Sequence, residues 1–336
     1  MRHALFISFS LVFILVFIGV GVASFWILQE VRAPSPLKKE KLIEIQAGAS
    51  VKRIAHLLEQ ENAISSALAF EIYTRVFERE EPLQAGEYKI QPHMSIKDIV
   101  DTLQSGQIYL HKLTIPEGYT NHQIRRLLEK ESLLKGEIES MPPEGYLMPE
   151  TYSFRKGLER QTLVNRIHEA KKDFLSDVWD QRQDDLPFES VEEAVTLASI
   201  VEKETAVASE RAKVAGVFVN RLEKGMRLQS DPTVIYALTA GVPGQEGQGA
   251  LGRRLLRKDL DFVSPYNTYE NAGLPPGPIA NPGKQSVLAV LNPAEHDYLY
   301  FVADGSGGHA FAKTLKEHNK NVAAWRKIRR QQNNSD

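Results

Sequence analysis

The sequence predicts an α+β protein with an N-terminal membrane helix, a small module of strands and helices, and a mainly helical second domain ending in a small hairpin. Three observations carry this prediction: one long uncharged stretch, a strand–turn–helix pattern that recurs three times, and a later series of helical patterns followed by two short apolar strands. The predicted boundaries are a cytoplasmic tail and transmembrane anchor at 1–32, a linker at 33–41, the module at 42–143, the second domain at 144–330 and a polar tail at 331–336.

The anchor is predicted from the stretch between Ala4 and Leu28, which holds no charged residue. This stretch exceeds the roughly 20 apolar residues that a membrane-spanning helix needs, whereas a signal peptide has an apolar region of only about 7–15 residues. We therefore expect an uncleaved anchor, with cleavage after Ala23 as the alternative that the small residues around it leave open. Arg2 precedes the span and several basic residues follow it, so the positive-inside count alone does not favour export of the body.

The module is predicted from three copies of one local pattern. In each copy an apolar strand end and a turn lead to Ser50, Ser95 or Thr120, and apolar residues then follow at helical spacing. A hydroxyl group just before a helix accepts a hydrogen bond from an otherwise unpaired backbone N–H, which explains why Ser or Thr recurs there. A further helix is expected over Leu68 to Phe77.

The second domain is expected to begin near residue 144 with an aromatic, proline-containing loop, followed by a long polar helix over about 161–183. Ser190 to Glu193 reads as a capping box that starts the next helix. Ser209 is the expected cap of the helix after that, and Gly225 is its expected end. Asp231 and Pro232 are the expected cap and first residue of a third helix.

The last third of the chain is expected to be less regular. A glycine-rich surface loop is predicted over 241–252, and the segment 264–283 is too rich in proline for a regular helix or a central strand. A long ordered irregular segment is typical of a binding site. Tyr298 to Ala303 and His309 to Phe311 are predicted to pair as antiparallel strands, and a basic amphipathic helix closes the chain.

Composition excludes several classes of function. The net charge of −2 gives no indication of a nucleic-acid partner, and the absence of cysteine excludes disulfides, thiolate metal sites and a cysteine nucleophile. Lys172 stands where a zinc-protease helix that begins at His168 would need its second histidine. No nucleotide-binding or serine-nucleophile motif occurs, so no metal and no cofactor is predicted.

Two glutamates, Glu202 and Glu204, fall on or beside the apolar face of the helix that begins near Ser190. A carboxylate in apolar surroundings is costly unless it is neutralised, paired or used, and burial favours its protonated form. Such a carboxylic acid can donate a proton near neutral pH, as cleavage of a glycosidic bond requires. Glu202 projects closer to the apolar face, so the helical pattern alone leaves both residues as candidates.

Polar and aromatic side chains further along the chain are expected to shape a sugar-binding cleft. Tyr266 and Tyr269 offer ring faces for stacking on sugars, with packing within the loop as the alternative. Hydrogen bonds to sugar hydroxyls are expected from Gln229, Asn267 and Thr268. Asp231 is a candidate binding residue as well, although its position before a helix also suits a plain cap.

Four long motifs in one order give a specific resemblance: residues 197–222, residues 226–238, residues 266–283 and residues 298–311. Together they resemble the membrane-anchored endolytic murein transglycosylase (YceG-like) family over nearly the whole chain. The resemblance implies that the module is similar to glycan-binding lysin motifs and that the second domain is a catalytic domain with lysozyme-like features. The repeat is also consistent with a plain folding unit.

The resemblance implies a lyase that cuts the MurNAc–GlcNAc β-1,4 bond of nascent peptidoglycan strands without water and leaves a 1,6-anhydroMurNAc end. One carboxyl group suffices in that scheme, since the MurNAc 6-hydroxyl is the nucleophile. Other lytic transglycosylases carry their acid as Glu followed by a hydroxyl residue, which here is Glu204 followed by Thr205. The resemblance therefore favours Glu204 as the catalytic residue, with Glu202 as a supporting residue paired with Lys203 or Arg211.

The resemblance also implies a location and partners. It places a single-pass anchor in the bacterial inner membrane and the body in the periplasm, where peptidoglycan strands are the substrate. The family's place in cell-wall growth suggests contact with glycan-polymerising synthases and a role in ending glycan elongation, although no stretch of the sequence identifies a docking surface. The alternative function is a membrane-tethered peptidoglycan-binding scaffold with an inactive catalytic domain.

Overall fold

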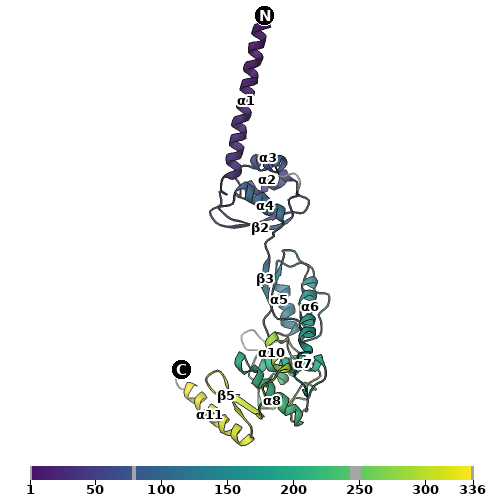
Figure 1. Ribbon diagram of the computed structural model, residues 1–336. Helices are drawn as coiled ribbons and strands as arrows, with labels where there is room; N and C mark the ends of the chain where they lie inside the picture. Colours follow the sequence, from purple (N-terminus) through teal and green to yellow (C-terminus); the bar gives the residue numbers. More distant parts are fainter. Residues whose placement is uncertain (1, 78–80, 243–250, 334–336) are drawn as a thin grey trace. The chain divides into compact units, whose positions relative to one another are not determined.

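The computed structural model describes residues 2–77, 81–242 and 251–333, and these residues form two compact units (Figure 1). The first unit comprises residues up to His111 together with Ser153–Lys156, and the second comprises Lys112–Tyr152 and the chain from Gly157 onward. Helices dominate and the sheets are two-stranded, so the predicted mixture of helices and small sheets is confirmed. The likeness to lysin motifs and to lysozyme stays a prediction.

The first unit begins with the long apolar helix α1 (Arg2–Arg32), whose described part from Val12 onward is long and apolar enough to cross a membrane. The last turn of α1 belongs to the core of this unit, because Val31 is buried there and Ile27 packs against the same cluster. The segment after α1 is also attached to the first unit. The Ser35 backbone N–H donates to the Met94 carbonyl at 2.8 Å, and Leu37 packs against the core.

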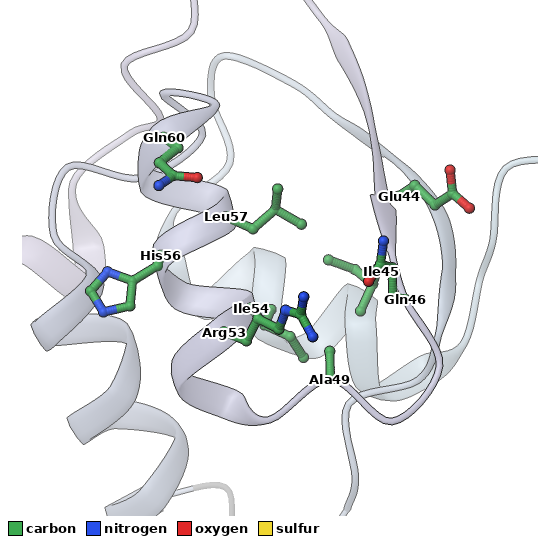
Figure 2. A pocket seen from close by; sticks show the side chains of 9 residues that line it. All are labelled: Glu44, Ile45, Gln46, Ala49, Arg53, Ile54, His56, Leu57 and Gln60. Carbon is green, nitrogen blue, oxygen red and sulfur yellow. The ribbon is translucent and has the colours of Figure 1, made fainter.

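The rest of the first unit alternates strands and helices, in the order β1 (Lys41–Ile45), α2 (Val51–Gln60), α3 (Ala67–Phe77), β2 (Gly86–Ile90) and α4 (Ile96–Ser105). Strands β1 and β2 pair antiparallel, with Ile43 opposite Tyr88, and the side chains of these two residues point into the core. Figure 2 shows a pocket of about 380 Å³ between the end of β1 and α2. It is lined by Glu44, Ile45, Gln46, Ala49, Arg53, Ile54, His56, Leu57 and Gln60.

The three predicted caps are confirmed. Ser50 accepts a hydrogen bond from the Arg53 backbone N–H at the start of α2, and Ser95 forms a capping box at the start of α4. Thr120 forms a capping box at the start of α5 (Asn121–Lys130), which lies in the second unit. The strand before α5 is β3 (His111–Thr114), and it pairs with β4 (Thr151–Phe154).

The helical core of the second unit is built from α7 (Val191–Glu204), which packs against α8 (Arg211–Glu223) and α10 (Lys284–Leu291). Before α7 comes α6 (Arg160–Trp179), and between α8 and α10 lie α9 (Asp231–Thr239) and the short 3₁₀ helix η2 (Arg257–Asp261). The capping box of Ser190 and Glu193 at the start of α7 is confirmed. The buried face of α7 carries Val195, Ala198 and Val201.

Three predicted helix boundaries are wrong by a few residues. A 3₁₀ turn, η1 (Ala208–Glu210), precedes α8, so Glu210 and not Ser209 stands before the helix, and it makes no side-chain cap. Helix α9 already begins at Asp231, with Ser230 in the cap position. Helix α6 ends at Trp179, a few residues before the predicted end. The predicted stop at Gly225 is confirmed by its positive φ of 63° just after α8.

The chain closes with the predicted hairpin and helix. Strands β5 (Tyr300–Ala303) and β6 (His309–Ala312) pair antiparallel and lie beside α11 (Leu315–Asn333), as Figure 1 shows. Most of the predicted glycine-rich loop at 241–252, namely 243–250, lies outside the described residues.

Candidate active site

Glu204 lies at the C-terminal end of α7, where the helix stops and the chain turns away at Thr205. The sequence fixes this position because the apolar face of α7 is buried up to Val201, which leaves the last turn at the edge of the core. Glu204 is half-buried, and it lines a pocket of about 430 Å³. The other lining residues are Phe218, Arg221, Leu228, Gln229, Asp231, Tyr269, Tyr300, Phe301, Val302, Leu315 and His318.

The carboxyl group of Glu204 has one close hydrogen-bond partner. The Ser230 hydroxyl donates to Glu204 Oε1 at 2.5 Å. Burial raises the pKa of Glu204 to about 7, the hydrogen bond from Ser230 opposes this rise, and the negative charge of Asp231 adds to it. Weaker opposing contributions to this pKa come from His309 and Arg221. A carboxyl group with a pKa near 7 can both donate and accept a proton at neutral pH.

Glu202 faces a different part of the second unit, although only one residue separates it from Glu204. Its Oε2 accepts hydrogen bonds from the Gly283 backbone N–H at 3.0 Å and the Ser286 hydroxyl at 2.7 Å, both at the start of α10. Its Oε1 lies 3.9 Å from Arg211 Nη2, so the predicted pairing with Arg211 is present. Glu202 therefore ties the end of α7 to the beginning of α10, and it is not among the residues that line the Glu204 pocket.

The turn before α9 forms one wall of the pocket. Gln229 adopts a φ of 49°, and its backbone N–H donates to the Thr268 carbonyl at 3.1 Å. The Ser230 backbone N–H donates to the Thr268 hydroxyl at 3.0 Å, which in turn lies 2.8 Å from the Thr233 hydroxyl. These bonds fix the turn, so that the side chain of Ser230 reaches Glu204 while the exposed Gln229 lines the pocket.

The proline-rich segment contributes Tyr269 to the pocket, and the Tyr269 hydroxyl donates to Asp231 Oδ1 at 2.6 Å. The other predicted residues of this segment lie elsewhere. Asn267 and Thr268 are fully buried, with the Asn267 amide donating to the carbonyls of Leu260 and Phe262. Tyr266 packs against Tyr236 with ring centroids 5.0 Å apart. Of the six residues predicted to bind substrate, Gln229, Asp231 and Tyr269 line the pocket with Glu204.

Several residues of the site were missed by the sequence analysis. Arg221 lies on the buried face of α8, seven residues after Val214 in the apolar stripe, so the argument applied to Glu202 and Glu204 would also have singled it out. Tyr300 and His318 come from β5 and α11, and no local pattern connects these elements with Glu204. Within the described ranges, no group of three or more His, Asp or Glu side chains is arranged to hold a metal ion.

A second buried carboxyl group, Glu144, lies in the aromatic loop near the start of the predicted second domain. Its Oε1 accepts hydrogen bonds from the Asn121 backbone N–H and the Asn281 side chain, each at 2.9 Å. Burial raises the pKa of Glu144 to about 7, and hydrogen bonds, including one from Tyr236, oppose the rise. Glu144 does not line the Glu204 pocket, and its contacts join the loop to the start of α5 and to Asn281 in the proline-rich segment.

Comparison with known proteins shows which family the chain belongs to. The YceG-like family model matches residues 43–324, and the chain belongs to this family. It is 36% identical over 314 residues to a Bacillus subtilis protein named endolytic murein transglycosylase, covering 83% of this chain and 82% of that one. A Streptococcus pneumoniae protein with the same name is 32% identical over 335 residues, which cover 85% of this chain but only 58% of the longer relative.

A solved structure shows the same fold. The crystal structure of a YceG-like protein from Listeria monocytogenes, at 35% identity, superposes with a TM-score of 0.52 and covers 84% of this chain and 99% of that one.

Proposed function

We propose that the protein is an endolytic murein transglycosylase that uses Glu204 as its only proton carrier. The observation that carries this proposal is a single half-buried carboxyl group with a pKa of about 7 on a pocket of about 430 Å³. The names of the relatives support the substrate class. The bond cleaved is the β-1,4 bond between MurNAc and GlcNAc in a peptidoglycan strand.

The reaction needs one residue to act twice. Protonated Glu204 gives its proton to the glycosidic oxygen as the bond from that oxygen to C1 of MurNAc breaks. The resulting carboxylate takes the proton of the MurNAc 6-hydroxyl, whose oxygen bonds to C1 and closes the 1,6-anhydro ring. Glu204 ends protonated as it began, and no water is consumed. In this proposal Gln229 and Tyr269, which line the pocket, hold the sugar, and the Ser230 hydroxyl orients the carboxyl group.

The presence of Asp231 in the same pocket gives a second candidate chemistry, because most glycoside hydrolases use two carboxyl groups. Asp231 Oδ1 is engaged by the Tyr269 hydroxyl, which favours a role in positioning over activation of water. The two chemistries differ in their products: a transglycosylase leaves anhydro ends, and a hydrolase leaves reducing ends that are one water heavier.

The deciding experiment digests purified glycan strands with the full-length protein in detergent and measures the product masses. We expect anhydro ends from the wild type and no cleavage by Glu204→Gln. Reducing ends would replace the proposal by a hydrolase. A folded protein that cleaves nothing would leave the peptidoglycan-binding scaffold as the remaining function.

The cellular setting is part of the same proposal. We propose that α1 spans the bacterial inner membrane with both units in the periplasm, where the enzyme cuts nascent strands and limits their length beside glycan-polymerising synthases. The β1–α2–α3–β2 order of the first unit, with its paired outer strands, supports a lysin-motif-like module that contacts glycan.

A further inference from the structure

Arg221 is a buried cation without a carboxylate partner among the described residues. It is only 8% exposed, and none of the ion pairs within 4.0 Å in the described part of the chain includes it. Burying a guanidinium group without a counter-ion is unfavourable, so such a residue usually has a function that compensates for the cost.

The geometry of Arg221 leaves part of its guanidinium group available. Nε donates to the Leu299 carbonyl and Nη1 to the Leu228 carbonyl, each at 2.7 Å. The group lies 5.4 Å from the ring centroid of Tyr300. A guanidinium group carries five N–H bonds. The two on Nη2 make no hydrogen bond to any described residue, and Arg221 lines the same pocket as Glu204.

The surroundings hold Arg221 rigidly. Tyr300 stacks on His318, with ring centroids 5.2 Å apart and planes inclined by 28°. Burial and the charge of Arg221 lower the pKa of His318, so this ring is neutral and adds no second positive charge at neutral pH. The pocket lining therefore contains both a cationic donor, the guanidinium group of Arg221, and the carboxylate of Asp231 with its Tyr269 partner.

We propose that Arg221 binds the lactyl group on C3 of a muramic acid residue, on the same sugar ring whose glycosidic bond Glu204 cleaves. This inference rests on the proposed function. The lactyl group ends in a carboxylate when no peptide is attached and in an amide carbonyl when one is, and both accept hydrogen bonds from a guanidinium group. N-acetylglucosamine has no such group. Arg221 thus lets the pocket distinguish the two alternating sugars, so that the MurNAc–GlcNAc bond and not the GlcNAc–MurNAc bond is placed at Glu204.

A purely electrostatic role for Arg221 is the competing explanation, because its charge also lowers the pKa of Glu204. That role would need no uncommitted N–H groups, and any ligand preference it gave would follow ligand charge alone, so it would be absent for the methyl ester and retained by Arg221→Lys. The two roles therefore differ in ligand preference, which can be measured without catalysis.

The test compares three monosaccharides as ligands of the full-length Glu204→Gln protein in detergent, by ligand-observed NMR titration. The ligands are N-acetylmuramic acid, its methyl ester and N-acetylglucosamine. We expect N-acetylmuramic acid to bind roughly tenfold or more tightly than N-acetylglucosamine, with the ester between them, because charge-assisted hydrogen bonds are about twice as strong as neutral ones. Adding Arg221→Lys should remove most of this preference, since lysine keeps the charge but loses the fork, and should leave N-acetylglucosamine binding unchanged. Arg182→Lys, at an arginine stacked on Trp179 outside the pocket, is the matched control and should change nothing.

Equal affinity for all three sugars would overturn the inference. So would an Arg221→Lys protein that shifts the pH profile of cleavage but keeps the sugar preference. Arg221 also donates hydrogen bonds to two backbone carbonyls, so its substitution can impair folding. In that case the comparison of the three ligands on the Glu204→Gln protein, which keeps Arg221, is the test of the inference. A wild-type protein that forms no anhydro ends would instead contradict the proposed function, whatever the sugar preference.

Discussion

At the scale of single residues, the function depends on how the fold balances the two forms of the Glu204 carboxyl group. Burial favours the protonated form, which must donate to the glycosidic oxygen. The Ser230 hydroxyl favours the carboxylate, which must then take a proton from the substrate. The two influences oppose each other and leave the pKa at about 7. One residue can therefore serve both half-reactions near neutral pH.

Replacing Glu204 by glutamine tests this role without changing the shape of the side chain. We expect the rate of glycan cleavage to fall by at least about a hundredfold, because the proton carrier is lost. The thermal unfolding midpoint should stay near that of the wild type, since glutamine can still accept the hydrogen bond from Ser230. Mass analysis of products and a thermal melt on the same preparation check both statements. An active Glu204→Gln protein together with an inactive, folded Glu202→Gln protein would reverse the assignment.

The pH dependence of cleavage gives a second test. The acid form of Glu204 is needed, so kcat/KM should decrease as the pH rises through about 7, by about tenfold per pH unit beyond it. Ser230→Ala removes a hydrogen bond that lowers the Glu204 pKa, so the decrease should move to higher pH. Asp231→Asn removes a negative charge that raises this pKa, so the decrease should move to lower pH. Shifts in the same direction for both variants would show that another group controls the profile.

The same pKa values predict how stability changes with pH. The carboxyl groups of Glu204 and Glu144 have pKa values raised by burial to about 7, so the folded protein holds their protons more tightly than the unfolded chain does. Their stabilising effect is fully present below the ordinary glutamate pKa and is lost as the pH rises through about 7. Urea midpoints of the wild type between pH 5 and 8 should therefore decline more steeply than those of the Glu144→Gln, Glu204→Gln double variant. Parallel curves would contradict the assigned shifts.

At the scale of elements, Glu202 joins α7 to α10 and so fixes the helix end that carries Glu204. The side chain of Glu202 is only 7% exposed. Lys171 supports the same junction by donating to the Pro282 carbonyl at 2.7 Å. Two glutamates separated by one residue thus have different roles: Glu202 holds the two helices together, and Glu204 lines the pocket.

Glu202→Ala should lower the free energy of unfolding by about 1–3 kcal/mol, because it leaves the Gly283 N–H and the Ser286 hydroxyl without their acceptor. Denaturant titration of the full-length protein measures this loss. The control is Glu169→Ala, which removes an exposed ion pair with Lys172 and should cost less than about 1 kcal/mol. Equal losses in the free energy of unfolding for the two variants would mean that the contacts of Glu202 stabilise the protein no more than an exposed ion pair does.

The elements were largely predictable from local patterns, and the exceptions have physical reasons. Ser50, Ser95, Thr120 and Ser190 were found because a helix cap depends on residues only a few positions apart. Ser209 failed as a cap because the chain first makes a 3₁₀ turn, and Glu210 at its end is bound to His309, a contact 99 residues away along the chain. Local sequence carries no information about such a partner.

The pocket was only partly predictable for the same reason. Four lining residues could be predicted because they lie in segments of unusual composition. They are Glu204, Gln229, Asp231 and Tyr269, and all four line the same pocket. Tyr300 and His318 reach the pocket because β5 packs against α8 and α11 packs against β5, and these are contacts that no local periodicity predicts. Asn267 and Thr268 look like sugar ligands in the sequence, yet their polar atoms are used inside the protein to hold the turn before α9.

At the scale of the whole molecule, the two compact units have separate hydrophobic cores. Leu58 and Phe70 belong to the first core, and Val201 and Phe218 belong to the second. Separate cores predict that a defect in one unit stays there.

Leu58→Ala tests this independence, because Leu58 is fully buried in the first unit and its truncation should cost about 2–5 kcal/mol. Hydrogen exchange should become faster in β1, α2 and α3 and stay unchanged in α7 and α10, and cleavage of soluble glycan strands should persist. Faster exchange in α7 to the same extent would show that the units unfold as one.

The packing of the last turn of α1 into the first core has a consequence for where the protein can act. Val31 and Ser35 leave no loose tether between the apolar helix and the first unit. With α1 in a bilayer, that unit would therefore search a thin layer at the membrane surface, and its effective concentration toward glycan in that layer would be high. Glycan farther from the membrane would contact this unit only after it had grown or diffused into that layer. A flexible insertion after Arg32 would enlarge the searched volume and dilute the module within it.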